Sequence, residues 1–111
     1  MRMSHTPYHA EIRPYQGRAT IFINDQPQSP LMYCLCAASG SEPWTEAPQR
    51  YFAQFVQAGY RILGIDTWLH HVWRPGEPID VGYVQRQVRA VLNVCPDAFV
   101  LIRINVSAPA W

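Results

Sequence analysis

The chain has 111 residues, of which 49% are hydrophobic and 15% charged, and its formal net charge is +1. A chain of this length makes one domain at most, and the composition is too apolar and too weakly charged for a disordered tail. The basic residues are scattered singly, so no electrostatic argument favours nucleic acid or an anionic membrane surface as a partner.

The N-terminal stretch "MRMSHTPYHAEIRPYQGR" lacks the apolar core of a signal peptide. No run approaches the roughly 18 apolar residues that a membrane span requires. We therefore expect a cytoplasmic protein without a membrane partner. Three cysteines are an odd number for a disulfide scaffold, and we interpret Cys34, Cys36 and Cys95 as buried thiols.

The chain begins with residues 1–18, which carry Pro and polar residues without periodicity and are expected to be a loose leader. The stretch "ATIFIND", residues 19–25, alternates apolar and polar side chains and ends in the turn pair Asn24-Asp25. Together with the segment that follows, it predicts a hairpin over residues 19–30.

The remainder alternates predicted strands with predicted helices. Residues 46–59 have apolar positions at helical spacing, with Pro48 in the first turn and Gly59 as the C-terminal stop. Residues 81–95 carry a second apolar stripe behind the candidate N-cap Asp80. The predicted strands cover residues 31–36, 60–66 and 98–106.

This order predicts an α/β fold, an N-terminal hairpin followed by a β-α-β-α-β segment with three parallel strands. Repeats of about 30–35 residues suit α/β barrels and doubly wound sheets. The first loop after a strand, "AASGSEPWTEAP", contains no G-x-G-x-x-G, which argues against a dinucleotide-binding fold. The prediction is therefore an incomplete TIM barrel over residues 19–111, made of the hairpin and the first three β/α units.

A series of motifs supports a family resemblance. "IFINDQPQSPLMY" carries an I-N-x-x-P turn into the first strand. A helix ending in "AG", an aromatic-rich loop after the next strand, D-x-x-Y-x-x-x-x-x-R-x-V-L and finally "RINVSAPAW" follow. Over residues 19–111 the series resembles (β/α)8-barrel glycoside hydrolases of the β-galactosidase-like type (clan A, family 42-like). The resemblance implies a parent enzyme that hydrolyses O-glycosidic bonds with retention.

The resemblance also implies that the catalytic carboxylates lie elsewhere, after the fourth strand and near the seventh. Retaining glycosidases need two carboxyl groups about 5–5.5 Å apart. Here only Asp66 sits at a predicted strand end, and Glu42, Glu46 and Glu77 have no identifiable partner. We expect no catalytic residue in this chain, inactivity on its own, and a role as part of the sugar-binding wall.

The loop "GIDTWLHHVWRPGEP" supplies most of the candidate binding residues. Asp66 either accepts hydrogen bonds from sugar hydroxyls or caps the loop. Trp68 and Trp73 either present flat faces to a sugar ring or pack beneath the loop. His70 and His71, taken as neighbours on an extended segment, point to opposite sides, which argues against a metal site. Either one of the two histidines forms a hydrogen bond with a sugar, or both are structural or solvated.

The third predicted strand supplies the other candidates. Arg103 and Asn105 alternate and so share a face, on which Asp66 is the expected partner of Arg103. The pair either contacts substrate or forms a purely structural bridge. Trp111 resembles a substrate-stacking aromatic of the complete enzyme. No cofactor is expected, and the expected partners are a carbohydrate and the remainder of the barrel or a second chain.

Two other hypotheses remain open. The chain could be a non-catalytic, self-associating α/β module that binds carbohydrate or protein, because three parallel strands leave two open edges. It could also belong to a different β/α barrel, such as an amidohydrolase-like enzyme, although no H-x-H pair on the first strand supports the metal-dependent versions.

Overall fold

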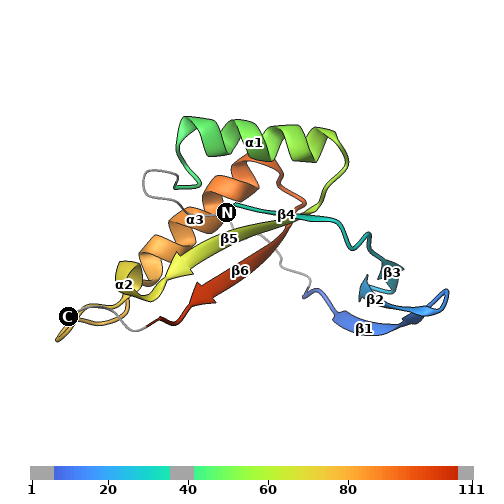
Figure 1. The fold of residues 1–111 in the computed structure, drawn as a ribbon, viewed down its shortest axis with the longest axis horizontal. Helices are drawn as coiled ribbons and strands as arrows, with labels where there is room; N and C mark the ends of the chain where they lie inside the picture. Colours follow the sequence, from blue (N-terminus) through green and yellow to red (C-terminus); the bar gives the residue numbers. More distant parts are fainter. Residues whose placement is uncertain (1–6, 36–41, 108–111) are drawn as a thin grey trace. The chain divides into compact units, whose positions relative to one another are not determined.

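In the computed structural model, which describes residues 7–35 and 42–107, the chain divides after Leu31 into two units. The first unit is an antiparallel sheet of three strands in the order β1-β2-β3 (Figure 1). Its strands are β1 (Ala10–Tyr15), β2 (Arg18–Ile23) and β3 (Gln26–Pro27). The predicted hairpin is thus confirmed as the β2-β3 pair, turning at Asn24 and Asp25, which both have positive φ.

The prediction of a loose leader over residues 1–18 is wrong for the part that forms β1. β1 pairs with β2 along its whole length through a second two-residue turn, Gln16-Gly17, whose φ angles are 50° and 79°. Pro14 argued against a strand, but β1 lies at the sheet edge, where a missing N–H is tolerated. On β2, Phe22 is buried beneath the Arg13 guanidinium, 3.8 Å from the ring centroid.

The second unit contains a parallel sheet in the order β4-β5-β6, as the alternation of strands and helices predicted. Its elements are β4 (Met32–Cys34), α1 (Glu46–Gln57), β5 (Ile62–Trp68), α2 (Leu69–Val72), α3 (Val81–Val94) and β6 (Phe99–Asn105). β4 is shorter than the predicted strand 31–36, although Leu35 N–H still donates to Gly64 O at 2.9 Å. Cys36, at the end of that prediction, lies outside the described residues.

The end of α1 and the start of α3 lie where the sequence predicts them. After α1, Gly59 adopts a φ of +100°, and two backbone bonds, from Gly59 N to Val56 O and from Tyr60 N to Phe55 O, close a Schellman motif. At the start of α3, the Asp80 carboxylate accepts a hydrogen bond from the Tyr83 backbone N–H at 3.2 Å. The chain therefore returns to the sheet at defined points.

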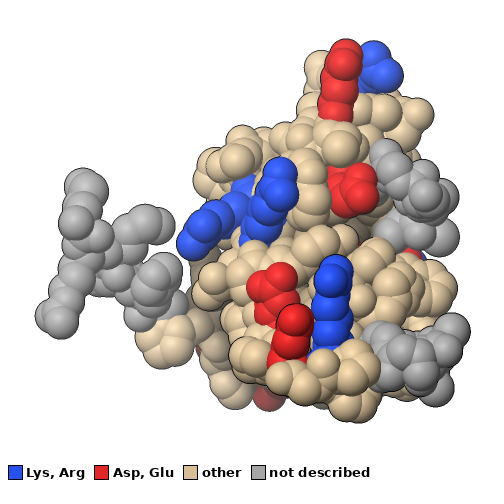
Figure 2. Space-filling view, turned by 90° about the vertical axis from the view of Figure 1, so that its left-hand side faces the viewer, with Lys and Arg blue, Asp and Glu red and all other residues tan. Residues whose placement is uncertain are grey.

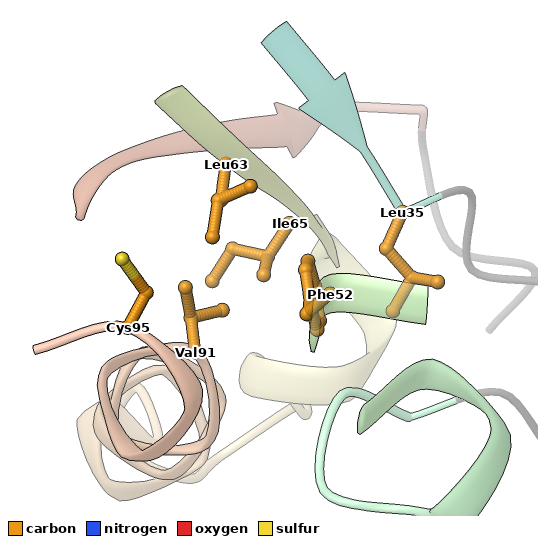
Figure 3. Close-up of a cluster of buried hydrophobic side chains, with 6 residues drawn as sticks. All are labelled: Leu35, Phe52, Leu63, Ile65, Val91 and Cys95. Atoms are coloured by element: carbon orange, nitrogen blue, oxygen red, sulfur yellow. The ribbon is translucent and has the colours of Figure 1, made fainter. Parts of the chain in front are cut away.

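The core lies between the sheet and one layer of helices. Figure 3 shows the side chains of the sheet pointing toward α1 and α3. The buried cluster consists of Leu35, Phe52, Leu63, Ile65, Val91 and Cys95. Tyr33 also faces this side and stacks on Phe55 with ring centroids 4.0 Å apart.

Because α1 and α3 pack on the same side, the opposite face of the sheet has no long helix over it among the described residues. We call it the open face. Strand alternation assigns to it the residues that lie between the core positions. They are Ile62, Gly64, Asp66 and Trp68 on β5, and Phe99, Leu101, Arg103 and Asn105 on β6.

The described helices include none that is long and apolar enough to cross a membrane. The two cysteines within the described residues, Cys34 and Cys95, are free thiols. Cys95 is buried as predicted, whereas Cys34 is only partly buried.

Candidate functional site

The C-terminal ends of β5 and β6 bring together an acid and a base on the open face. Asp66 and Arg103 are register partners in the parallel ladder, so their side chains leave the sheet side by side. Arg103 Nε donates to Asp66 Oδ1 at 2.6 Å, which confirms the predicted pairing. The Asp66 side chain is 14% exposed and that of Arg103 49%, so the pair is accessible from solvent.

A buried glutamine holds the end of β5 in place. The Gln87 side chain, on α3, is 1% exposed. Its Nε2 donates to the Asp66 backbone O at 2.8 Å, and its Oε1 accepts a hydrogen bond from Thr67 Oγ1 at 2.6 Å. Because buried polar groups are costly when unpaired, these two bonds fix β5 against α3 at the point where Asp66 emerges.

Beyond the ion pair, the open face continues to an aromatic and an amide. Trp68 and Asn105 are the next register partners on the same face, two residues further along each strand. Asn105 Oδ1 accepts a hydrogen bond from Ser107 N–H at 3.0 Å, which orients its amide. An acid, a guanidinium, an amide and an indole thus follow one another along the C-terminal end of the sheet.

The prediction that His70 and His71 lie on an extended segment is wrong, because they form part of the one-turn helix α2. Neighbouring side chains on a helix point about 100° apart rather than to opposite sides. Their rings consequently touch, with centroids 4.3 Å apart. Within the described residues, no group of three or more His, Cys, Asp or Glu side chains is placed to hold a metal ion.

α2 contributes two rings to a row of aromatic side chains that extends from the C-terminal end of β5 to the loop before α1. We call it the aromatic row; its members are Trp68, His70, His71, Tyr83 and Trp44, with centroids between successive rings 4.3–5.8 Å apart. At its far end the Arg86 guanidinium covers Trp44, 3.9 Å from the ring centroid. The row joins the loop before α1 to the start of α3.

Burial and neighbouring groups shift the pKa values of His71 and Tyr83 in the directions that favour their neutral forms. Burial, and then the neighbouring His70 imidazole, lower the pKa of His71, an effect that Glu42 opposes. Burial and the charge of Glu42 raise the pKa of the Tyr83 phenol. The Tyr83 hydroxyl and His71 Nδ1 lie 3.3 Å apart and share a hydrogen bond.

A hollow of about 140 Å³ lies beside α2. It is lined by His71, Val72, Arg74, Glu77, Pro78 and Asp80. Pockets that enclose a small-molecule ligand usually measure about 300–1,000 Å³, so this hollow alone is too small to bury one. Trp73, the residue after α2, is 43% exposed.

The acidic residues of the site lie in two places. Asp66 contacts a guanidinium, and Glu77 and Asp80 line the hollow beside α2. On the side of the molecule seen in Figure 2, basic and acidic side chains are interspersed among neutral ones. The Asp66–Arg103 pair therefore presents a hydrogen-bond acceptor and a hydrogen-bond donor side by side.

The predicted binding residues fall into separate groups. The open face carries Asp66, Trp68, Arg103 and Asn105. The aromatic row contains His70 and His71, and Trp68 connects this row to the open face. Trp73 follows α2. Trp111 lies outside the described residues. Sequence reasoning missed Trp44, Tyr83 and Gln87. Gln87 could have been noticed as the one amide within the apolar stripe Val84, Val88 and Val91.

Comparison of the chain with protein-family models, with curated proteins and with solved structures found no match.

Proposed function

We propose that this chain forms part of the wall of a carbohydrate site in a β/α-barrel glycoside hydrolase of the β-galactosidase-like type. The observation that carries the proposal is the Asp66–Arg103 pair on the open face, at the C-terminal ends of two parallel strands. In β/α barrels this end of the strands is where ligands bind. The proposal keeps the incomplete barrel and the parent activity that the motif series implies.

The chemistry of the pair suits sugar hydroxyls. A carboxylate accepts hydrogen bonds and a guanidinium donates them, whereas each hydroxyl can do both. Because the two charges are 2.6 Å apart and opposite, the pair presents polar groups without net charge, as an uncharged ligand requires. Trp68 on the same face supplies a flat apolar surface against which the C–H side of a sugar ring can pack.

The proposed role is binding without catalysis. Retention requires a second carboxyl group about 5–5.5 Å from the first. The partner of Asp66 is instead Arg103, and the acids Glu77 and Asp80 line the hollow beside α2. The chain alone is thus proposed to bind sugar weakly and to leave nitrophenyl glycosides intact.

Calorimetric titration with methyl β-galactoside, methyl β-glucoside and lactose tests the proposal. We expect weak, saturable binding that Asp66→Asn reduces about tenfold, as the loss of one charge-assisted hydrogen bond would. Asp97→Asn is the matched control, because Asp97 precedes β6 at the other end of the sheet, where it pairs with Arg61. No saturable binding, or equal losses in both variants, would leave the Asp66–Arg103 pair as a structural bridge only.

The non-catalytic claim has its own assay. We expect no release of nitrophenol above the uncatalysed rate from nitrophenyl β-galactoside or β-glucoside. Turnover that Asp66→Asn abolished would contradict this claim and make Asp66 a catalytic residue.

A further inference from the structure

The outer edge of β6 is self-complementary, so that it can pair with the same edge of a second copy. We propose that a second copy of this chain pairs with β6 in antiparallel fashion about a two-fold axis at Ile102, giving a continuous six-stranded sheet. In this arrangement the second copy occupies the edge that a further strand would occupy in a complete barrel. The proposal does not rest on sugar binding by the open face, which is tested separately.

β6 is the edge of the parallel sheet that is fit for pairing. No strand among the described residues lies beyond it, and it runs for seven residues, whereas β4 at the other edge has three (Figure 1). β6 contains no Pro, Gly or Lys, the residues that commonly protect an edge. Its single charge, on Arg103, is neutralised by Asp66.

The hydrogen bonds within the sheet define which backbone groups point outward. Phe99 N–H donates to Arg61 O at 2.8 Å, so Phe99 is directed toward β5. In a parallel ladder successive residues alternate between the two neighbouring strands. The N–H and C=O groups of Val100, Ile102 and Ile104 therefore point to the outer edge.

Among antiparallel registers, one uses all of β6. With Ile102 opposite Ile102 of the second copy, Val100 lies opposite Ile104, and all three outward-pointing residues form hydrogen-bonded pairs. Moving the axis to Arg103 places two guanidinium groups directly opposite each other and leaves Val100 unpaired. Moving it to Leu101 leaves Ile104 unpaired. The number of outward-pointing residues that find a partner, together with the single charge, selects the axis at Ile102.

The side chains agree with this register. On the helix side of β6, Ile102 is 40% exposed and Ile104 62%, although the corresponding β5 residues Ile65 and Thr67 are 0% and 2% exposed. Pairing would cover Ile102 with Ile102 of the second copy and Ile104 with Val100 of the second copy. On the open face it would place Leu101 of the second copy beside Arg103, so that the polar end of each sheet would be flanked by the other chain.

Disulfide trapping tests the register. In Ile102→Cys the two new thiols would lie on opposed residues about 5.5 Å apart at Cα, within the range that a disulfide spans. In Ile104→Cys each new thiol would face Val100, so this matched variant should trap little dimer. Peptide mass spectrometry after mild oxidation distinguishes a 102–102 bond from bonds of the native cysteines. Trapping at 104 in preference to 102 would overturn the register.

Sedimentation equilibrium tests the association itself. We expect a reversible dimer of the parent chain whose dissociation constant Ile102→Lys raises about tenfold or more, because a lysine on each copy would place like charges directly opposite. Ile79→Lys is the control, since Ile79 is also exposed, at 62%, but lies before α3. A parent chain that stays monomeric would overturn the proposal and leave the edge to a further strand of a barrel. So would equal effects of the two lysines.

Discussion

Gln87→Leu removes the amide that joins α3 to the end of β5 while keeping a side chain of similar volume. Two groups lose this partner, the buried Thr67 hydroxyl and the partly buried Asp66 backbone carbonyl. Each unsatisfied buried group costs about 1–3 kcal/mol, and the leucine recovers about 1–2 kcal/mol through apolar burial. The net prediction is a loss of about 2–3 kcal/mol in the free energy of unfolding.

Urea denaturation followed by circular dichroism and tryptophan fluorescence measures this loss. With a urea slope of about 1–1.5 kcal/mol per molar, the midpoint should fall by about 2 M. Gln85→Leu is the matched control, because Gln85 is exposed on the same helix, and it should change the free energy by less than about 0.5 kcal/mol. In Thr67→Val/Gln87→Leu the combined loss should be smaller than the sum of the single losses. A Gln87→Leu midpoint equal to that of the control would refute the reasoning.

Three further predictions concern single sites. Gly64→Ala should cost about 1–3 kcal/mol, because the new Cβ would overlap Cys34 Sγ, and Cys34→Ala in the same chain should restore most of the loss in urea denaturation. The pKa of His71 is lowered in the folded chain, so between this pKa and 6.5 the unfolded chain binds more protons than the folded chain. The free energy of unfolding therefore rises as the pH increases through that window, and it decreases as the pH falls through it. Urea titrations of the parent and His71→Gln should show this rise flattened in the variant; identical slopes would contradict the assignment. Cys95 is 2% exposed, and burial and its hydrogen bond to Asp97 raise the pKa of its thiol. It should therefore react with a thiol reagent only when the chain unfolds. Labelling of Cys95 in the folded chain at a rate near that of Cys34 would refute its burial.

The elements with strong local signals were predictable from the sequence. Gly59 and Asp80 marked the end of α1 and the beginning of α3, because a positive φ and an N-cap carboxylate are local requirements. The pairing of Asp66 with Arg103 was also predicted, since strand alternation and parallel order are enough to place both on one face. The α/β succession and the hairpin at Asn24 follow from the same local rules.

What the sequence did not reveal depends on tertiary context. β1 was missed because Pro14 weakens a strand signal, and only its position at the edge of the sheet makes it acceptable. The single turn α2 is too short to show helical periodicity, so the contact between His70 and His71 could not be anticipated. The contact between Trp44 and Tyr83 joins the loop before α1 to α3, and no local pattern in the sequence indicates it.

The central claim is that the open face, and not the hollow or the part of the aromatic row beyond Trp68, binds a neutral sugar. Titration of isotope-labelled chain with methyl β-galactoside, followed by amide and indole NMR signals, tests it directly. The account predicts saturable shifts at Asp66, Trp68, Arg103 and Asn105 that Asp66→Asn suppresses and Asp97→Asn leaves intact. Saturable shifts confined to Arg74, Glu77 and the other residues of the hollow, or no saturable shifts at all, would contradict it.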